Sequence, residues 1–233
     1  SSIRVAALVG ILGTFAVMFS GDSSGIHVAK YQPMKLAAAE GLEDGGERAP
    51  FSIVPGIEIP GMLSILATHD IDGYVPGINN ILDGYTTPDG EYHPSAEEKM
   101  ARGKLALEAF SDYRELKDSD PAAAAEARAT LDQNIEYFGY GYIESRDELV
   151  PPVPLIYWAF RVMVGLGGFL LMLMFFVLCA ERRRRIENMR WLLWVALLSI
   201  PLVYIAGQAG WIVAEVGRQP WTIEGLLPVK AAV

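Results

Sequence analysis

Residues 191–221 read WLLWVALLSIPLVYIAGQAGWIVAEVGRQPW, and this stretch decides the fold. Its first 24 residues, Trp191 to Ala214, carry no charge. About 20 apolar residues are enough for a helix to cross a lipid bilayer. The run ends at Glu215, which is therefore expected at the membrane boundary, where a carboxylate is costly and often serves ion, proton or cofactor binding. The alternative is an interfacial Glu215 that pairs with Arg218 and anchors the helix end.

Two further apolar segments flank a long polar region. With the first stretch they predict transmembrane helices over residues 1–20, 155–180 and 191–216. The fold class is therefore all-α integral membrane, a bundle of three transmembrane helices with a large, partly helical extracytoplasmic loop. The chain begins without Met, and its first apolar run lacks the pattern of a signal peptide. We expect helix 1–20 to be incomplete at its N-terminus and the chain to be a fragment.

The distribution of charge predicts the topology. Residues 181–190 (ERRRRIENMR) hold five arginines, which favours a cytoplasmic loop by the positive-inside rule. By alternation, residues 21–154 form an extracytoplasmic loop and residues 217–233 an extracytoplasmic tail. Residues 22–153 contain 24 Asp and Glu against 10 Lys and Arg, a net charge of −14, as expected for a region in contact with water.

The composition excludes several kinds of site. Cys179 is the only cysteine, so the chain has no intrachain disulfide and no cysteine-based metal or iron–sulfur site. The three histidines, His27, His69 and His93, all fall in the expected outer loop. The chain therefore offers no intramembrane histidine ligand.

The outer loop contains signals for two amphipathic helices. Ser95 and Glu98 have the spacing of a capping box, and an apolar face follows them. Asp120-Pro121 supplies an N-cap and a proline at the first helical position. We expect two helices packed against each other, whereas Leu42–Pro50 and Asp83–Pro94 have the composition of turns.

Several residues near the outer membrane boundary are candidates for chemistry. Trp211, Glu215 and Arg218 share one helix face because they are spaced i, i+4 and i+7. Arg161 and Met163, two residues apart, point in different directions on their helix. The alternatives are ordinary: Trp and Arg are common interface residues, and an apolar-helix Met usually packs in a core.

Two charged residues after the first helix are further candidates. Lys35 and Glu40 are five apart, so they are not placed to form a helical ion pair with each other. They are either solvated residues of a juxtamembrane helix or groups that reach one polar ligand from two directions.

Three motifs resemble subunit I of the cytochrome bd quinol oxidases. Gly210–Trp221 (GWIVAEVGRQPW) match the family pattern GWxxAExGRQPW, and Phe160–Val164 match FRxMV. Gly21–Gly25 and Gln32–Glu40 match the opening of the family's quinol loop, GDxSG followed by QPxKLAAxE. The motifs occur in the family's order and their span covers most of the chain.

The resemblance implies haem-binding roles. Met163 would be an axial ligand of the low-spin haem b iron, and Glu215 would ligate the high-spin haem b iron. Arg161 would stabilise the low-spin haem, Trp211 would lie beside the haems, and Arg218 would lie near propionates. The implied cofactors are these two haems b and haem d. The family's haem-ligating histidines lie in upstream helices that this chain does not contain.

The resemblance also implies the substrates and partners. Lys35, Glu40 and Asp22 would contact quinol, and residues 21–154 would be the quinol-binding loop. The intact complex would be a multi-pass quinol:oxygen oxidoreductase of the bacterial plasma membrane that reduces dioxygen to water and contributes to a proton gradient. Its partners would be oxidase subunit II, small accessory subunits and membrane lipid, with no nucleic acid. This chain by itself is not expected to be active.

A second class of function stays open from the sequence. The chain could belong to a membrane transporter or sensor with an extracytoplasmic ligand-binding loop. In that case Arg161 and Glu215 would form a structural ion pair.

Overall fold

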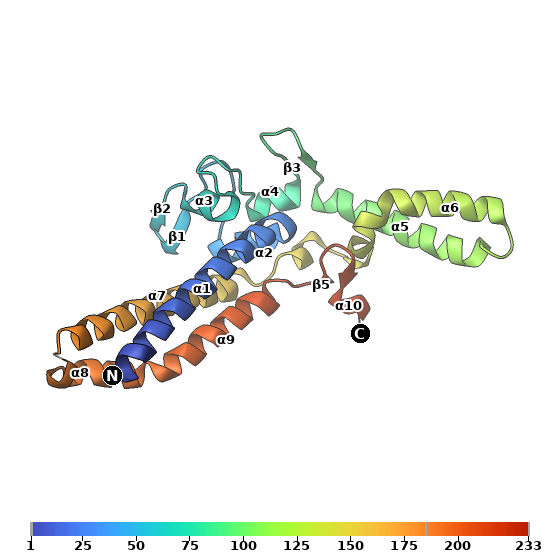
Figure 1. The fold of residues 1–233 in the computed structure, drawn as a ribbon. Helices are drawn as coiled ribbons and strands as arrows, with labels where there is room; N and C mark the ends of the chain where they lie inside the picture. The colour runs from blue at the N-terminus through green and yellow to red at the C-terminus, as the bar shows by residue number, and fades with distance from the viewer. Residues whose placement is uncertain (1, 185, 233) are drawn as a thin grey trace.

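The molecule is built on three long apolar helices that lie side by side (Figure 1). The structure is a computed structural model that describes residues 2–184 and 186–232. Helices α1 (Ser2–Tyr31) and α7 (Val153–Arg182) are two of the three, and α8 (Arg190–Leu198) with α9 (Ile200–Val216) forms the third. Large apolar side chains cover their outer surfaces, as expected where lipid or further apolar helices surround them. The predicted all-α membrane fold is confirmed.

Prolines set two helix boundaries that differ from the predicted ones. Helix α1 does not end with its apolar run at Ser20 but continues to Tyr31. Its first stop signal is Pro33, since the residue before a proline disfavours the helical conformation, and Gln32 has φ −134° and ψ 56°. The expected single helix 191–216 is divided near Pro201, which lacks a backbone N–H for the helical hydrogen bond.

The polar region packs on one end of the bundle through small residues. Helix α2 (Pro33–Glu40) lies against α7, and Ala38, Ala39 and Ile156 are buried between them. Because alanine side chains are short, the two helices approach closely. Helices α3 (Met62–Thr68) and α4 (Ile78–Asp83) follow, and α3 packs on α1.

Three short antiparallel hairpins were not predicted. Their strands are β1 (Phe51–Val54) with β2 (Ile57–Ile59), β3 (Tyr85–Thr86) with β4 (Tyr92–His93), and β5 (Trp221–Ile223) with β6 (Leu227–Pro228). Strands of two to four residues are too short to show a period of two in the sequence. The β5–β6 turn uses Gly225 at φ +70°, a conformation that favours glycine. The last helix, α10 (Val229–Ala232), follows this hairpin.

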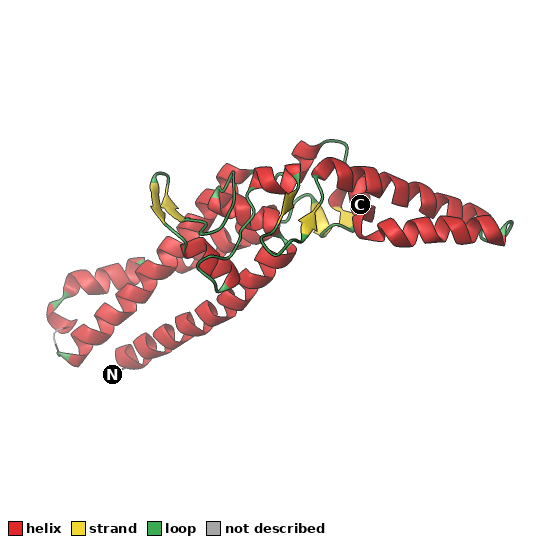
Figure 2. Ribbon diagram, turned by 90° about the horizontal axis from the view of Figure 1, so that it is seen from above, coloured by secondary structure: helices red, strands yellow, loops and turns green. Residues whose placement is uncertain are grey.

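Two helices of the polar region form a hairpin that projects away from the bundle (Figures 1 and 2). Helices α5 (Ala96–Leu116) and α6 (Pro121–Asn134) pack on each other as predicted. Ser95 caps α5 by accepting a hydrogen bond from the Glu98 amide at 3.2 Å, but the Glu98 side chain bonds to Arg102 and Tyr92. The capping box is therefore half formed.

Short 3₁₀ helices make three of the connections. They are η1 (Ile135–Tyr142), η2 (Arg146–Leu149) and η3 (Ile186–Asn188). The η3 segment belongs to the arginine-rich loop 181–190. Arg185 of that loop lies outside the described residues.

Candidate functional site

An apolar cavity of about 780 Å³ lies where α1, α2, α3 and α7 meet. Its walls are mainly aromatic and aliphatic, and the apolar lining residues include Phe15, Met18, Phe19, Val28, Leu36, Leu63, Leu66, Phe160, Met163 and Val213. Three ionisable residues also line it: Asp22, Lys35 and Glu40. The structure therefore brings the three predicted quinol residues and Met163 to a single cavity.

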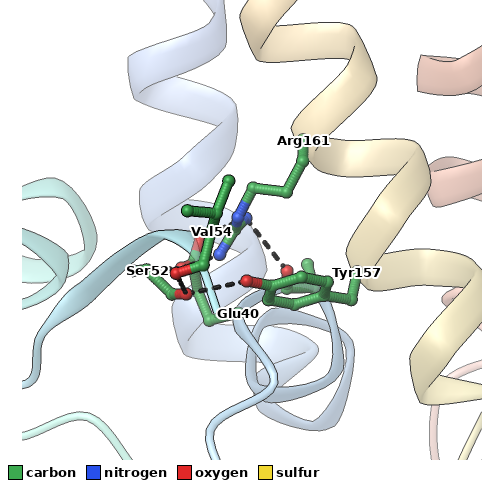
Figure 3. A network of polar contacts seen from close by, with 6 residues as sticks. Glu40, Ser52, Val54, Tyr157 and Arg161 are labelled. Carbon is green, nitrogen blue, oxygen red and sulfur yellow. Dashed lines mark hydrogen bonds and ion pairs between the residues drawn. The ribbon is translucent and has the colours of Figure 1, made fainter. Parts of the chain in front are cut away.

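Glu40 forms a buried ion pair with Arg161 (Figure 3). Arg161 Nη2 donates to Glu40 Oε2 at 2.8 Å, and the two side chains are only 7% and 2% exposed. The Ser52 amide donates to the same oxygen at 3.3 Å. Burial raises the pKa of Glu40, while the guanidinium and the Ser52 amide oppose this rise. The remaining oxygen, Oε1, has only a long contact of 3.5 Å to Nη1, so it can accept a further hydrogen bond.

Aromatic rings hold the guanidinium of Arg161 in place. Its Cζ lies 4.4 Å from the ring centroid of Tyr157, 5.1 Å from Phe51 and 5.2 Å from Phe160. The hydroxyls of Tyr157 and Ser52 are 2.8 Å apart, which ties α7 to β1 (Figure 3). Arg161 Nη1 also donates to the Ala39 carbonyl at 3.2 Å, whereas Nε has no hydrogen-bond partner among the described residues. Arg161 thus fixes the position of Glu40 without lining the cavity itself.

The structure does not contain the Arg161–Glu215 ion pair that the transporter or sensor alternative implied. Arg161 pairs with Glu40, and Glu215 pairs with Arg218 at 2.7 Å. The reason is local: Arg218 is three residues after Glu215 on the same helical face, while the buried carboxylate of Glu40 has no other cation at salt-bridge distance in the described chain. The ion pair that the transporter or sensor alternative would have between Arg161 and Glu215 is therefore absent from the described residues.

Lys35 connects α2 to the end of α9. Its Nζ donates to the Ala214 carbonyl at 3.3 Å, and its side-chain carbons reach the space beside Gly217. Burial lowers the pKa of Lys35, and the nearby carboxylate of Glu215 opposes this shift. As the sequence spacing predicted, Lys35 and Glu40 do not pair with each other.

Asp22 has a partner that the sequence did not reveal. Its Oδ2 lies 3.2 Å from Nε2 of His69, the residue that ends α3 with φ +60°. The contact joins α1 to α3 at the rim of the apolar cavity, and both side chains are partly exposed. Among the other histidines, His27 lies on the extension of α1 beyond its apolar run and stacks on Tyr31.

Met163 and Glu215 occupy neighbouring parts of the bundle. The Met163 sulfur of α7 lies 2.9 Å from where a β-carbon on Gly210 of α9 would stand, so the Met163 side chain packs directly against the glycine. Glu215 uses only Oε2 in its bonds to Arg218, and Oε1 accepts no hydrogen bond from a described residue. Trp211, one turn earlier, is 62% exposed.

Comparison with known proteins identifies the family. The family profile described as "Cytochrome bd terminal oxidase subunit I" matches residues 1–233, the whole chain. The chain belongs to this family. It is 32% identical to the cytochrome bd-II ubiquinol oxidase subunit 1 of Escherichia coli (strain K12) over 99% of this chain and 48% of that protein. It is 28% identical to the cytochrome bd ubiquinol oxidase subunit 1 of Bacillus subtilis (strain 168) over 100% of this chain and 40% of that one.

The fold comparison agrees with the sequence comparison. The bd oxidase from Geobacillus thermodenitrificans matches with a TM-score of 0.57 and 25% identity, over 97% of this chain and 41% of that one. This member of the cytochrome bd subunit I family therefore spans less than half the length of the relatives it matches. Family membership and the three apolar helices together indicate an integral protein of the bacterial plasma membrane.

Haem is the cofactor that membership of the cytochrome bd family implies. The described residues contain no cluster of three or more His, Cys, Asp or Glu that could hold a free metal ion. They do offer single donors suited to a haem iron: the thioether of Met163 and the free oxygen of Glu215. A β-carbon on Gly165, Gly167 or Gly168 would meet no heavy atom within 4 Å, so this α7 surface is open to a flat group. The donor atoms and the open surface of α7 therefore fit a haem group.

Proposed function

We propose that this chain forms the quinol-binding part of subunit I in a quinol:oxygen oxidoreductase. The observation that carries the proposal is the apolar cavity of about 780 Å³ with charged residues on its lining, in a chain of the cytochrome bd family. A quinol has a polar aromatic head and an apolar isoprenoid tail. The phenylalanine and methionine lining suits the tail, and Lys35 and Glu40 suit the head.

The two charged residues would orient the quinol head. The Lys35 ammonium donates a hydrogen bond to one quinol oxygen, and Glu40 Oε1 accepts one from a quinol hydroxyl. Arg161, held by three aromatic rings and the Ala39 carbonyl, keeps the Glu40 carboxylate in a single position. Asp22, paired with His69, lies at the rim and would contact the head less directly. Preorganised polar groups of this kind reduce the entropic cost of positioning a substrate.

The haem residues follow from the same proposal. Met163 would donate to the iron of a low-spin haem b, and Glu215 to the iron of a high-spin haem b. Trp211 and Arg218 would lie beside the haems, with Arg218 available to a propionate, and haem d would complete the set. When bound, these haems supply one-electron transfer from quinol and the reduction of dioxygen. Arg161 would act on the low-spin haem through its charge while it holds Glu40.

The complete complex would include partners outside this chain. Its relatives are first subunits, so we infer a second oxidase subunit, with small accessory subunits and membrane lipid around it. The arginine-rich loop 181–190 favours the cytoplasmic side, which would put the cavity near the outer face. Protons from quinol would then leave outside and protons for water would come from inside, so the reaction would charge the membrane.

The proposal is tested on the complete protein that contains this chain. Wild type should show haem bands in a reduced-minus-oxidised spectrum and quinol-driven oxygen uptake. Lys35→Ala removes a charged hydrogen bond of about 1.5–3 kcal/mol, so quinol oxidation should fall about ten- to a hundredfold with the haems retained. Lys104→Ala, at an exposed lysine of α5, is the matched control. Oxygen uptake driven by an artificial donor should survive in Lys35→Ala; equal quinol rates in the two variants would refute the site.

A further inference from the structure

A second, polar cavity lies on the other side of α2. It has a volume of about 470 Å³ and is bounded by the end of α1, α5, η1 and the hairpins β3–β4 and β5–β6. Pro33 and Met34 at the start of α2 line it, while Lys35, Leu36 and Glu40 line the apolar cavity. Helix α2 is therefore the wall between a membrane-side cavity and a polar one.

Glu224 enters the polar cavity from the β5–β6 turn. The hairpin is fixed on η1, because the Gly139 amide donates to the Gly225 carbonyl at 2.9 Å and Trp221, 4% exposed, packs edge-on against Tyr140 at 4.8 Å. Glu224 is half-buried yet has no hydrogen bond or ion pair with any described residue. Because the Glu224 carboxylate has no direct partner among the described residues, it can hydrogen-bond to water or bind a proton.

Lys99 of α5 lines the same cavity, and its side chain also lacks a direct partner among the described residues. The Nζ atom of Lys99 lies 5.8 Å from the centre of the Tyr140 ring, and this ammonium has no hydrogen bond to a described residue. The positive charges of Lys99 and Lys35 lower the pKa of Glu224, but burial, which raises it, has the larger effect. Lys35 itself lines the apolar cavity, so Glu224 is the polar-side carboxylate that is electrostatically linked to the membrane-side cavity.

We propose that Glu224 accepts a proton released by quinol oxidation beside Lys35 and passes it to water in the polar cavity. This inference rests on the proposed function. Oxidation of a quinol breaks two O–H bonds and yields a quinone, two protons and two electrons, and the haem of the complete oxidase would take up the electrons. One proton passes directly to water. The other, carried by intervening water, forms an O–H bond on the Glu224 carboxylate. The acid then returns the proton to water and becomes a carboxylate again.

The groups around Glu224 suit this route to the exterior. Glu136 and Tyr140 face it from η1, and beyond them Lys30 of α1, Glu91 and His93 line the same cavity. Glu91 and Glu136 are exposed, so the cavity meets bulk water at this margin and a proton leaving Glu224 needs no further protein group.

The pKa of Glu224 suits a group that transfers protons near neutral pH. Burial raises the pKa of Glu224 to about 7, and Lys99 and Lys35 partly oppose the rise. A carboxylate with this pKa accepts and releases protons near neutral pH, which is the condition for efficient proton transfer. Below pH 7 the group is already protonated and cannot accept, so quinol oxidation should fall as the pH drops through about 7.

The test compares Glu224→Gln with Glu136→Gln in the complete oxidase. Glu136 is an exposed carboxylate of the same cavity, so it controls for charge. Glu224→Gln should slow quinol oxidation about tenfold, remove the pH step near 7 and raise the solvent deuterium isotope effect. Oxygen uptake from an artificial donor and the haem spectrum should stay normal. Glu224→Asp, which keeps the carboxylate, should recover most of the rate.

The outcomes separate this inference from the proposed function. If wild type oxidises quinol and Glu224→Gln matches Glu136→Gln at every pH, the relay is refuted and the quinol site stands. If Glu224→Asp with a normal haem spectrum is as slow as Glu224→Gln, the carboxylate is not the operative group and the relay is also refuted. If wild type oxidises no quinol, the proposed function fails first.

Discussion

Breaking the Glu40–Arg161 pair should destabilise the protein and impair quinol oxidation together. Both side chains are almost fully buried, at 2% and 7% exposure, and are joined by a 2.8 Å hydrogen bond. In Glu40→Gln the guanidinium keeps its aromatic cage and the Ala39 carbonyl but loses its counter-charge. Removing one partner of a buried pair typically costs about 3–5 kcal/mol, because the other charge stays buried without compensation.

A double-mutant cycle measures this coupling. Glu40→Gln and Arg161→Met are made singly and together in the complete protein, and unfolding is followed by circular dichroism in mixed detergent micelles. The double variant should be more stable than the sum of the single losses predicts, by about 1.5–3 kcal/mol. Asp72→Asn is the control, since its pair with Arg48 is exposed and should be worth about 0–1 kcal/mol.

The same cycle has a functional readout. Arg161 does not line the apolar cavity, yet Arg161→Met should raise the KM for quinol because Glu40 loses the contact that orients it. Additive single losses in stability, with a normal KM in Arg161→Met, would refute the reasoning: the pair would then be neither coupled nor a positioning device.

The remaining predictions concern the haem donors and the topology. Met163→Leu should abolish the low-spin haem b spectrum, although a core methionine tolerates leucine at a cost below about 1.5 kcal/mol; a normal spectrum would remove Met163 as a ligand. Glu215→Gln should abolish the high-spin haem b signal, whereas loss of an exposed ion pair alone costs about 0–1 kcal/mol and would leave both haems intact. In a Cys179→Ser background, an impermeant thiol reagent on intact cells should label Ser95→Cys and spare Asn188→Cys; the reverse pattern would overturn the predicted sidedness.

Hydropathy and capping signals were sufficient to predict the three membrane helices and the helices α5 and α6. Three apolar runs predicted the three membrane helices, and Ser95 and Asp120 predicted the starts of α5 and α6. These signals are local, so they can be read from one stretch of chain. The continuation of α1 to Tyr31 was missed because a change from apolar to polar residues does not end a helix, whereas Pro33 does.

The site depended on contacts that a single sequence does not encode locally. No sign in the sequence indicated that Arg161 pairs with Glu40, because the two residues lie 121 positions apart in the chain. Spacing correctly excluded a Lys35–Glu40 pair but could not show that both line one cavity. Glu224 gave no signal at all, because its importance arises only where the β5–β6 hairpin meets η1 and α5.

The central claim is that quinol binds in the apolar cavity between α1, α2, α3 and α7, and a photoreactive quinone tests it most directly. An azidoquinone is irradiated with the complete membrane-embedded protein, and the modified peptides are identified by mass spectrometry. Adducts should fall within residues 15–28, 35–40 and 63–67, and excess unlabelled quinone should suppress them. Adducts confined to α5 and α6, or adducts that native quinone does not displace, would contradict the account.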